Sequence, residues 1–378
     1  MTKVVILGPA HPLRGGLASF DERLAKAFIS KGHECSIYTF SLQYPSFLFP
    51  GTTQYSSEPA PQGLDIHVCV NSVNPFNWIK IGKILIKIKP DTLVVRFWLP
   101  FMGPCLGSIL RYVRRNHHTR IICIADNVIP HEHRVGDSML TRYFIGVPHA
   151  FITMSEKVRS DLKKFRPEVP ERCVAHPLYD NFGEKIDKFT ARQKLGIDPG
   201  IRLCLFFGFI RKYKGLDLLL EAFAGKFLKN ADIHLLVAGE YYEDSKFYLD
   251  IIEKNNIQEK VILRTNFIPD SEVKYYLSAA DVVVQPYREA TQSGVTPLAY
   301  HFEVPMIVTN VGALPQLVPH GEVGRVCEPE PEAIENAIAA FFNMDSLKLM
   351  EGILREKKKL SWDTLVESIM SLSNDLEK

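Results

Sequence analysis

Several signatures of specialised protein classes are missing from this 378-residue sequence. Its seven cysteines include no C-x-x-C pair, so no structural zinc site is expected, and several lie in apolar runs typical of buried free thiols. The formal net charge of +2 gives no overall basic character that would point to nucleic acid as a partner. We therefore expect a globular protein of a reducing, cytoplasmic compartment.

We expect neither a signal peptide nor a transmembrane helix in this sequence. The N-terminal apolar run is too short for a signal peptide and instead predicts a first buried strand. The most apolar later stretch, residues 93–110, is interrupted by Arg96, Pro100 and Pro104. These interruptions make it a poor candidate for a transmembrane helix.

Two common ligand-binding motifs do not occur. The loop after the first strand, residues 8–16, reads GPAHPLRGG, so the G-x-G-x-x-G fingerprint of a nicotinamide dehydrogenase is absent. No D-x-D triplet occurs either, and we expect neither a metal ion nor a bound cofactor. The loop does contain Gly15 and Gly16, directly before a predicted helix. Two glycines there let a ligand approach backbone N–H groups at a positive helix end, although a plain flexible connector is the alternative.

Both halves of the chain alternate strands and helices, which predicts an α/β fold with parallel strands and helical crossovers. In the first half we predict one helix and six strands, over Leu17–Ser30 and over Lys3–Leu7, Glu34–Phe40, Leu64–Val70, Thr92–Phe97, Arg120–Ala125 and Ala150–Met154. In the second half we predict two helices and five strands, over Leu216–Phe223 and Asp270–Ala279 and over Arg202–Phe207, His234–Ala238, Lys260–Leu263, Val282–Gln285 and Pro305–Thr309.

The length also favours two domains, because a single compact core seldom serves so long a chain. We predict Rossmann-like domains over residues 1–180 and 198–358, with the polar, proline-bounded segment Pro177–Pro199 as a linker. An amphipathic helix over Ser361–Leu376 ends the chain. Sheets of this kind bind ligands at the carboxyl ends of their strands. If the two domains face each other, the ligand lies in a cleft between them.

The strongest motif lies in residues 205–222, LFFGFIRKYKGLDLLLEA. A strand ends at Gly208, Arg211 and Lys214 follow, and Gly215 opens a helix. A glycine at the strand end lets a ligand come close, and the neighbouring strand likewise ends at Gly239. The two cations suit a diphosphate, which needs charge-assisted hydrogen bonds, whereas taken alone they would be solvated surface residues.

A second motif follows in residues 281–312. Its strand runs into Pro286, and a polar loop then leads to a helix that begins near Val295. Ser293 and Gly294 would present backbone N–H groups at this helix start. Glu289 would accept hydrogen bonds from sugar or ribose hydroxyls, or it only caps a turn.

The order of these motifs resembles that of the GT-B glycosyltransferases, and in particular the retaining family 4 group. The likeness spans nearly the whole chain, and the shared order of the motifs makes it more specific than any single motif. The similar segments are Gly15–Gly16, the MSEKVR stretch at 154–159, Gly208–Gly215, Pro286–Gly294 and Pro305–Gly312.

This resemblance implies transfer of a sugar from a nucleotide diphosphate sugar to a glycan or lipid-linked acceptor, with retention of anomeric configuration. It implies that the second domain binds the donor through the motifs above, with Arg211 and Lys214 stabilising the departing diphosphate. It also implies that the first domain binds the acceptor and that the final helix packs back on it.

The chain departs from the family pattern at two places. A second carboxylate usually lies eight residues after the first, but the position eight residues after Glu289 is Pro297. A histidine often follows a strand of the first domain, but the matching place holds Asp126 and Asn127, with His131 nearby. Asp126 and His131 therefore both stay candidates for the acceptor side. These departures also keep open a non-catalytic nucleotide-binding scaffold and a sugar-nucleotide epimerase.

One further segment, residues 76–120, holds nine Lys or Arg and a single acid, interleaved with aromatic and aliphatic residues. A basic, aromatic face could rest on anionic lipid at the inner face of a membrane. Ordinary core with solvated lysines is the alternative, which we favour slightly.

Overall fold

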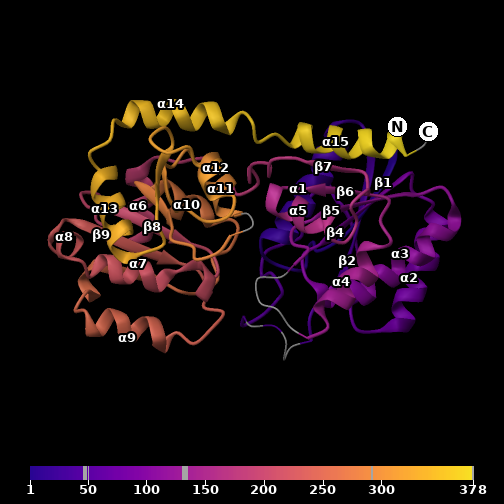
Figure 1. Cartoon of the computed structure of the whole chain (residues 1–378), viewed down its shortest axis with the longest axis horizontal. Coiled ribbons are helices and arrows are strands. Elements are labelled where there is room, and N and C mark those ends of the chain that lie inside the picture. Colours follow the sequence, from indigo (N-terminus) through magenta and orange to yellow (C-terminus); the bar gives the residue numbers. More distant parts are fainter. Residues whose placement is uncertain (46–48, 50, 130–134, 291–292, 377–378) are drawn as a thin grey trace. The chain divides into compact units, whose positions relative to one another are not determined.

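The computed structural model describes residues 1–45, 49, 51–129, 135–290 and 293–376. The chain divides into two compact units. The first comprises Met1–Pro177 and Ser361–Lys378, and the second comprises Leu178–Leu360. Each unit is an α/β layer structure with helices on both sides of a parallel sheet (Figure 1).

The sheet of the first unit has seven parallel strands in the order β3-β2-β1-β4-β5-β6-β7. Chain order reverses between β1 and β4, so loops diverge at that point and leave room for a ligand. The strands are β1 (Lys3–Leu7), β2 (Glu34–Leu42), β3 (Asp65–Asn71), β4 (Thr92–Phe97), β5 (Arg120–Ala125), β6 (Ala150–Thr153) and β7 (Glu171–Cys173).

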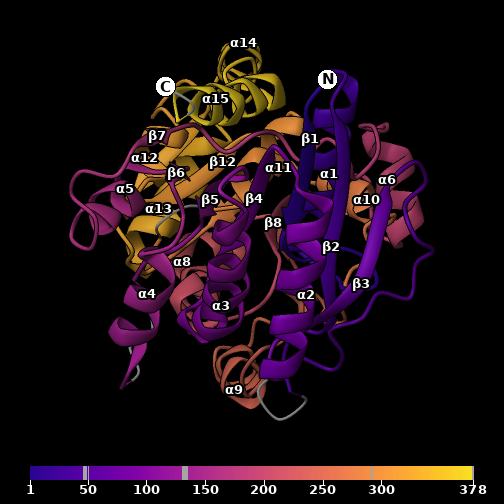
Figure 2. The same cartoon turned by 90° about the vertical axis from the view of Figure 1, so that its right-hand side faces the viewer.

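Five helices of the first unit follow its strands as crossovers. They are α1 (Gly16–Ser30), α2 (Pro75–Ile88), α3 (Gly103–Val113), α4 (Asp137–Ile145) and α5 (Glu156–Lys163), together with the short turns η2 (Pro100–Met102) and η3 (Arg114–Asn116). The helix α15 (Trp362–Asp375) joins this unit from the end of the chain. Helices α2 and α3 lie side by side (Figures 1 and 2). The strands β1, β4 and β5 are buried along nearly their whole length and are rich in aliphatic residues, as expected for strands covered on both faces.

The final helix α15 packs on α1, β5 and β6 within the first unit. Its Trp362 ring lies 4.9 Å from that of Phe20, and Arg23 lies over the indole at 5.0 Å. Thr92 Oγ1 and Ser373 Oγ share a buried hydrogen bond of 2.8 Å. The end of the chain is thus a structural part of the unit that begins it.

The sheet of the second unit has six parallel strands in the order β10-β9-β8-β11-β12-β13, and its chain order reverses between β8 and β11. The strands are β8 (Arg202–Phe207), β9 (Ile233–Ala238), β10 (Val261–Arg264), β11 (Val282–Gln285), β12 (Met306–Thr309) and β13 (Gly324–Cys327). The helices and turns are α6 (Lys188–Leu195), η4 (Lys212–Lys214), α7 (Leu216–Phe223), α8 (Lys226–Asn230), α9 (Lys246–Lys254), η5 (Gln258–Lys260), α10 (Val273–Ala279), α11 (Val295–His301), α12 (Leu314–Leu317), α13 (Pro331–Phe341) and α14 (Ser346–Lys357).

The segment predicted as a linker is instead folded. Its helix α6 packs against α10, and Arg192 of α6 binds the Ala279 carbonyl at 3.0 Å and Asp281 at 2.9 Å. Proline residues near both ends of the segment suggested a spacer, but the residues between them include this helix. Strands β7 and β13 were not predicted, because both are short and carry polar residues at the sheet edge.

Two composition-based expectations concern thiols and membranes. The seven cysteines all lie among the described residues and form no disulfide, and Cys35, Cys105, Cys123 and Cys204 are buried. No helix in the described part of the chain combines the length and apolarity needed to cross a bilayer.

Candidate functional site

The carboxyl ends of β8 and β9 in the second unit meet through two glycines. Gly208 and Gly239 both have positive φ, at 94° and 141°. A Cβ added to Gly239 would lie 2.3 Å from the Gly208 carbonyl oxygen, so a side chain there would force the strand ends apart. Neither strand end therefore carries a side chain, and β8, which ends at Gly208, borders the point where the chain order of the sheet reverses.

Gly208 also brings the two predicted motifs together. A Cβ on Gly208 would lie 3.0 Å from Lys214 Nζ and 3.8 Å from Val295 Cγ2. Lys214 belongs to η4, which follows β8, whereas Val295 is the first residue of α11, which follows β11. Residues predicted from separate motifs therefore surround one glycine.

A close backbone contact fixes this arrangement. Gly215 has φ 68°, and a Cβ there would lie 2.0 Å from the Pro286 carbonyl oxygen. Only glycine fits between η4 and the end of β11. Gly312 has the same role at the end of the neighbouring strand β12, because a Cβ there would lie 1.5 Å from the Ala290 carbonyl oxygen.

Lys214 is almost fully buried, and its ammonium has no carboxylate partner among the described residues. Asp217, the nearest acid in sequence, accepts a 2.5 Å hydrogen bond from Arg288 Nη2 instead. Burial, together with the positive charge of Arg211, lowers the pKa of Lys214 to about 7. The Lys214 ammonium lies 5.8 Å from the centre of the Tyr287 ring. Such a group is stabilised by an anion placed beside it.

Arg211 is half-buried at the start of η4, and its guanidinium lies over the Tyr242 ring at 5.0 Å. Tyr242 stacks on Phe209 at 4.2 Å, and Phe209 stacks on Phe267 at 6.3 Å. This row of partly buried rings follows the ends of β8, β9 and β10. Sequence reasoning missed it because the three aromatic residues are far apart along the chain.

The other predicted donor residues lie around α11. Ser293 is buried and donates its hydroxyl hydrogen to Gln285 Oε1 at 2.7 Å, while its Oγ accepts the Val295 N–H at 3.2 Å. Its hydroxyl therefore fixes the loop to β11 rather than projecting freely. A large side chain would not fit at Gly294, because an added Cβ would lie 3.2 Å from Cε2 of the Tyr179 ring. Glu289 is exposed beside the buried Ala290, and Thr291–Gln292 lie outside the described residues.

In the first unit, the predicted glycine loop is held by hydrogen bonds. The Ala10 N–H donates to Thr39 Oγ1 at 2.8 Å, and the His11 N–H donates to Glu22 Oε1 at 2.7 Å. Gly15 has φ 97°, which favours glycine, and Gly16 is exposed as the first residue of α1. These contacts argue against a plain flexible connector.

Asp126 follows the end of β5 and is buried in an ion-pair network. Both of its carboxylate oxygens accept hydrogen bonds from Arg96, at 2.6 and 2.7 Å. Arg96 also donates to Asp21 Oδ1 at 3.2 Å, and its guanidinium lies 3.9 Å from the Phe20 ring centre. A bidentate, buried Asp126 is placed to orient Arg96. His131, the other acceptor-side candidate, lies outside the described residues.

Asp21 is a member of this network that the sequence did not reveal. Burial raises the pKa of Asp21 to about 7, although the Arg96 guanidinium opposes that effect. The side chain also explains Gly8, since a Cβ there would lie 2.2 Å from Asp21 Oδ2. Asp21 lies on the buried face of α1. The one signal that could have identified it in the sequence is a carboxylate among the apolar residues that form this face.

Comparisons with known proteins bear on the family and on the fold of the chain. Residues 187–375 match the family described as glycosyl transferases group 1. The chain is 27% identical over 190 residues to D-inositol 3-phosphate glycosyltransferase of Mycolicibacterium gilvum, which is 49% of this chain and 42% of that protein. It is 23% identical over 394 residues to an uncharacterized glycosyltransferase of Methanocaldococcus jannaschii, covering 98% and 97% of the two chains.

Solved structures share the whole arrangement of elements. The Anabaena protein Alr3699/HepE, crystallised in complex with UDP and glucose, superposes with a TM-score of 0.72 at 14% identity and covers 100% of both chains. At this identity the likeness establishes the fold, which is that of the GT-B glycosyltransferases.

The buried Asp21 carboxyl predicts a pH dependence of stability. Because the folded protein holds this proton more tightly than the unfolded chain, the stabilisation is present below about pH 4 and is lost as the pH rises through about 7. Asp21→Asn should remove that fall, which we would measure as the denaturation midpoint of both proteins between pH 4 and 8. Asp126→Asn, which weakens the ion pair with Arg96, is the control and should lower the midpoint at every pH. If the denaturation midpoints of wild type and Asp21→Asn changed in parallel with pH, the raised pKa of Asp21 would be contradicted.

The lowered pKa of Lys214 predicts proton uptake when a diphosphate binds. Without a bound anion, the Lys214 side chain is largely a neutral amine above about pH 7. A diphosphate bound beside it raises the pKa of Lys214, so the amine takes up a proton. Calorimetric titration with a nucleoside diphosphate near pH 8.5, in buffers of different ionisation enthalpy, should show uptake that approaches one proton. Lys214→Met should abolish the uptake, whereas Lys212→Met, at an exposed neighbour, should leave it in place. Equal uptake in wild type and Lys214→Met would rule out this role.

Proposed function

This chain belongs to the glycosyl transferases group 1 family and is a glycosyltransferase, and we propose that it takes its sugar from a nucleotide diphosphate sugar. The proposed acceptor is a glycan or a lipid-linked saccharide, and the anomeric configuration is retained. The observation that carries the proposal is the buried ammonium of Lys214 beside Gly208, with Arg211 next to it and no carboxylate partner among the described residues.

The diphosphate would lie between these groups at the ends of β8 and β11. As the bond from the sugar to the diphosphate breaks, negative charge grows on the leaving group. Cations fixed at that place stabilise the transition state more than the ground state. The bare backbone of Gly208 and Gly239 permits the close approach, and the rings of Phe209 and Tyr242 offer a face on which a nucleobase can stack.

We propose that these protein cations take the place of a divalent metal. Lys214 and Arg211 supply two positive charges where a metal would bridge the phosphates, and the donor acts as co-substrate with no further cofactor. Support for a nucleotide donor also comes from the Anabaena protein, which was crystallised with UDP and glucose.

The first unit is proposed to bind the acceptor near Gly15, Gly16 and the Arg96 network. Asp126 acts there as a positioning residue, because both of its oxygens are bound to Arg96.

The alternative function is that of a non-catalytic nucleotide-binding subunit, and the absence of a second carboxylate eight residues after Glu289 favours it. It would bind the donor without releasing or transferring the sugar.

Peripheral contact with a membrane through α2 also belongs to the proposal. Phe76 is 84% exposed at the first turn of this helix, and Lys83 and Lys87 are exposed along it. Trp78 and Trp98 do not take part, because both are partly buried with their indole N–H groups bound, to Asn71 O and Tyr44 Oη. Most aromatic residues of this segment therefore serve the core.

A donor screen tests the proposed function. Among UDP-, GDP- and ADP-sugars, one should raise the melting temperature with concentration and be turned over when an acceptor is supplied. Turnover should persist in EDTA, since the diphosphate is held by protein cations. Stabilisation without hydrolysis or transfer would favour the scaffold alternative. Activity lost in EDTA and restored by Mg²⁺ or Mn²⁺ would contradict the metal-free site.

Variants of the two cations test the catalytic assignment. Lys214→Ala should lower kcat by roughly 30- to 1000-fold, because one charge-assisted contact to a leaving group is worth about 2–4 kcal/mol. Arg211→Lys should also be impaired, since an ammonium cannot reproduce the planar guanidinium fork. Steady-state kinetics with the active donor provides the measurement.

Two controls accompany these kinetics. Lys212→Ala removes an exposed cation between the two and should keep wild-type turnover. Circular dichroism and thermal melts must show that every variant is folded. Full turnover by Lys214→Ala and Arg211→Lys would remove the support for a diphosphate at this site, and a collapsed melting transition would indicate a structural role instead.

A further inference from the structure

The turn η4, which carries Lys214, has little internal support. It spans three residues, and its backbone hydrogen bonds run from Lys214 N to Arg211 O at 2.9 Å and from Gly215 N to Lys212 O at 3.1 Å. An isolated turn of this kind has poor hydrogen-bond geometry and gains too little from its few bonds to hold its place alone. The position of the Lys214 ammonium therefore depends on what packs against the turn.

Arg288, in the segment that follows β11, contacts the chain on both sides of Lys214. Its backbone N–H donates to the Tyr213 carbonyl at 2.7 Å. Its side-chain Nη2 donates to Asp217 Oδ2 at 2.5 Å, and Asp217 lies in the first turn of α7. Tyr213 directly precedes Lys214, and Asp217 follows it by three positions. Arg288 thus brackets the lysine with a main-chain hydrogen bond and an ion pair.

This ion pair is more than a surface contact. The Asp217 side chain is 10% exposed, and that of Arg288 is 41% exposed. Asp217 Oδ1 is buried and has no hydrogen-bond partner in the described part of the chain. Without the Arg288 guanidinium, the carboxylate would stay buried and lose its opposite charge, which is costly. The ion pair therefore favours the arrangement in which the start of α7 lies against the segment after β11.

We propose that the ion pair of Arg288 and Asp217 positions Lys214 for the departing diphosphate, so that both are positioning residues of the transfer reaction. The inference rests on the proposed function, in which the Lys214 ammonium stabilises the leaving group. Neither residue needs to touch the substrate, because both act through the turn between them. The backbone contacts of Arg288 and Gly215 involve neither side chain of the pair, so variants shortened at residue 217 or 288 are expected to fold.

Steady-state kinetics on Arg288→Ala and Asp217→Ala tests this role. The two variants remove the same bond from opposite sides. Each should lower kcat by roughly 10- to 100-fold with little change in the KM for the donor, since a misplacement of about 1 Å can cost about 100-fold. Arg288→Lys should recover most of the loss, because the observed contact uses one nitrogen and an ammonium can donate the same single bond. In a Lys214→Ala background, Arg288→Ala should cost little more, because its effect acts through Lys214.

Proton uptake provides a second measurement, which a contact that serves stability alone would not change. When η4 is loosened, Lys214 is less buried, and its pKa rises from about 7 toward its ordinary value. Calorimetric titration near pH 8.5 uses UDP, GDP or ADP, whichever binds wild type most tightly. Arg288→Ala and Asp217→Ala should both take up clearly less than the nearly one proton expected of wild type. Because they change the local charge in opposite directions, a decrease in both identifies a displaced Lys214 rather than a distant charge.

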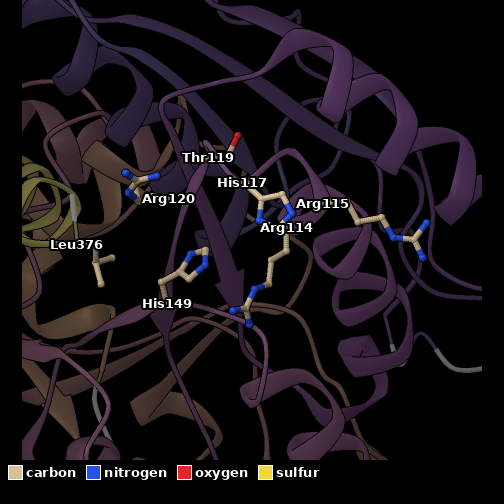
Figure 3. A pocket seen from close by; sticks show the side chains of 7 residues that line it. All are labelled: Arg114, Arg115, His117, Thr119, Arg120, His149 and Leu376. Atoms are coloured by element: carbon tan, nitrogen blue, oxygen red, sulfur yellow. The ribbon is translucent and has the colours of Figure 1, made fainter. Parts of the chain in front are cut away.

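Two control variants remove an arginine elsewhere in the protein. Arg355 of α14 has a side chain that is 54% exposed and forms an ion pair with Glu322 of the same unit. Arg115 borders a cavity of about 430 Å³ in the first unit, and Figure 3 shows its side chain extending away from the other labelled side chains. It packs on the Tyr112 ring, at 4.5 Å. Arg355→Ala and Arg115→Ala should therefore keep wild-type kcat and proton uptake, even if their melting temperatures fall slightly.

The outcomes separate this inference from the proposed function. If Lys214→Ala loses kcat while Arg288→Ala and Asp217→Ala keep wild-type kcat and uptake, the positioning role is overturned and the diphosphate site remains. Wild-type turnover by Lys214→Ala removes the diphosphate site and the positioning role together. Impairment of Arg288→Ala alone, with Asp217→Ala unaffected, assigns Arg288 to direct substrate contact and overturns positioning. A full additional loss when Arg288→Ala is added to Lys214→Ala overturns it as well.

Two further cases keep the test decisive. If the chain binds the donor without transferring its sugar, the proton uptake of the same variants decides, and uptake equal to wild type in both overturns the inference. Should an alanine variant melt early, Arg288→Gln and Asp217→Asn replace the pair, with the same expected decreases.

Discussion

An ammonium group that is removed from water, with no carboxylate partner in the described part of the chain, is the constraint around which the site of the second unit is built. A buried cation costs free energy unless an opposite charge is supplied, and in proteins the pKa of such a group shifts toward the neutral form. Lys214 shows that shift, to about 7. The unit therefore gains most when an anion occupies the space beside Gly208, which ties its stability to its ligand.

Backbone contacts around Lys214 hold this arrangement in place. Gly215 presses against the Pro286 carbonyl, and Gly239 presses against that of Gly208, so three segments meet with no side chain between them. The hydroxyl of Ser293 is bound to Gln285 and keeps the start of α11 in place. Because these contacts are backbone packing, the cation does not need to hold the loops together. Under the proposed function it is available to stabilise the leaving group.

How much of this could be predicted from the sequence depends on how local each feature is. Strands such as Lys3–Leu7 and Thr92–Phe97 were predicted to their exact bounds, because short apolar runs bounded by turn residues are a local signal. Gly208 and Lys214 were assigned together because they lie only six positions apart in the sequence. The Arg96, Asp126 and Asp21 network was not predicted, since its members come from β4, the end of β5 and α1. Asp126 was singled out from its place after a strand, but nothing in the sequence links it to Arg96 or Asp21.

The two basic centres described above differ in how their charge is balanced, and that difference indicates what each does. Arg96 is balanced within the fold by the Asp126 carboxylate, by its hydrogen bond to Asp21 and by the face of Phe20, so it organises the first unit. Lys214 is buried and has no carboxylate partner among the described residues, so under the proposed function the diphosphate of the donor balances its charge. Balance of charge, rather than the number of basic residues, separates structural cations from those that bind.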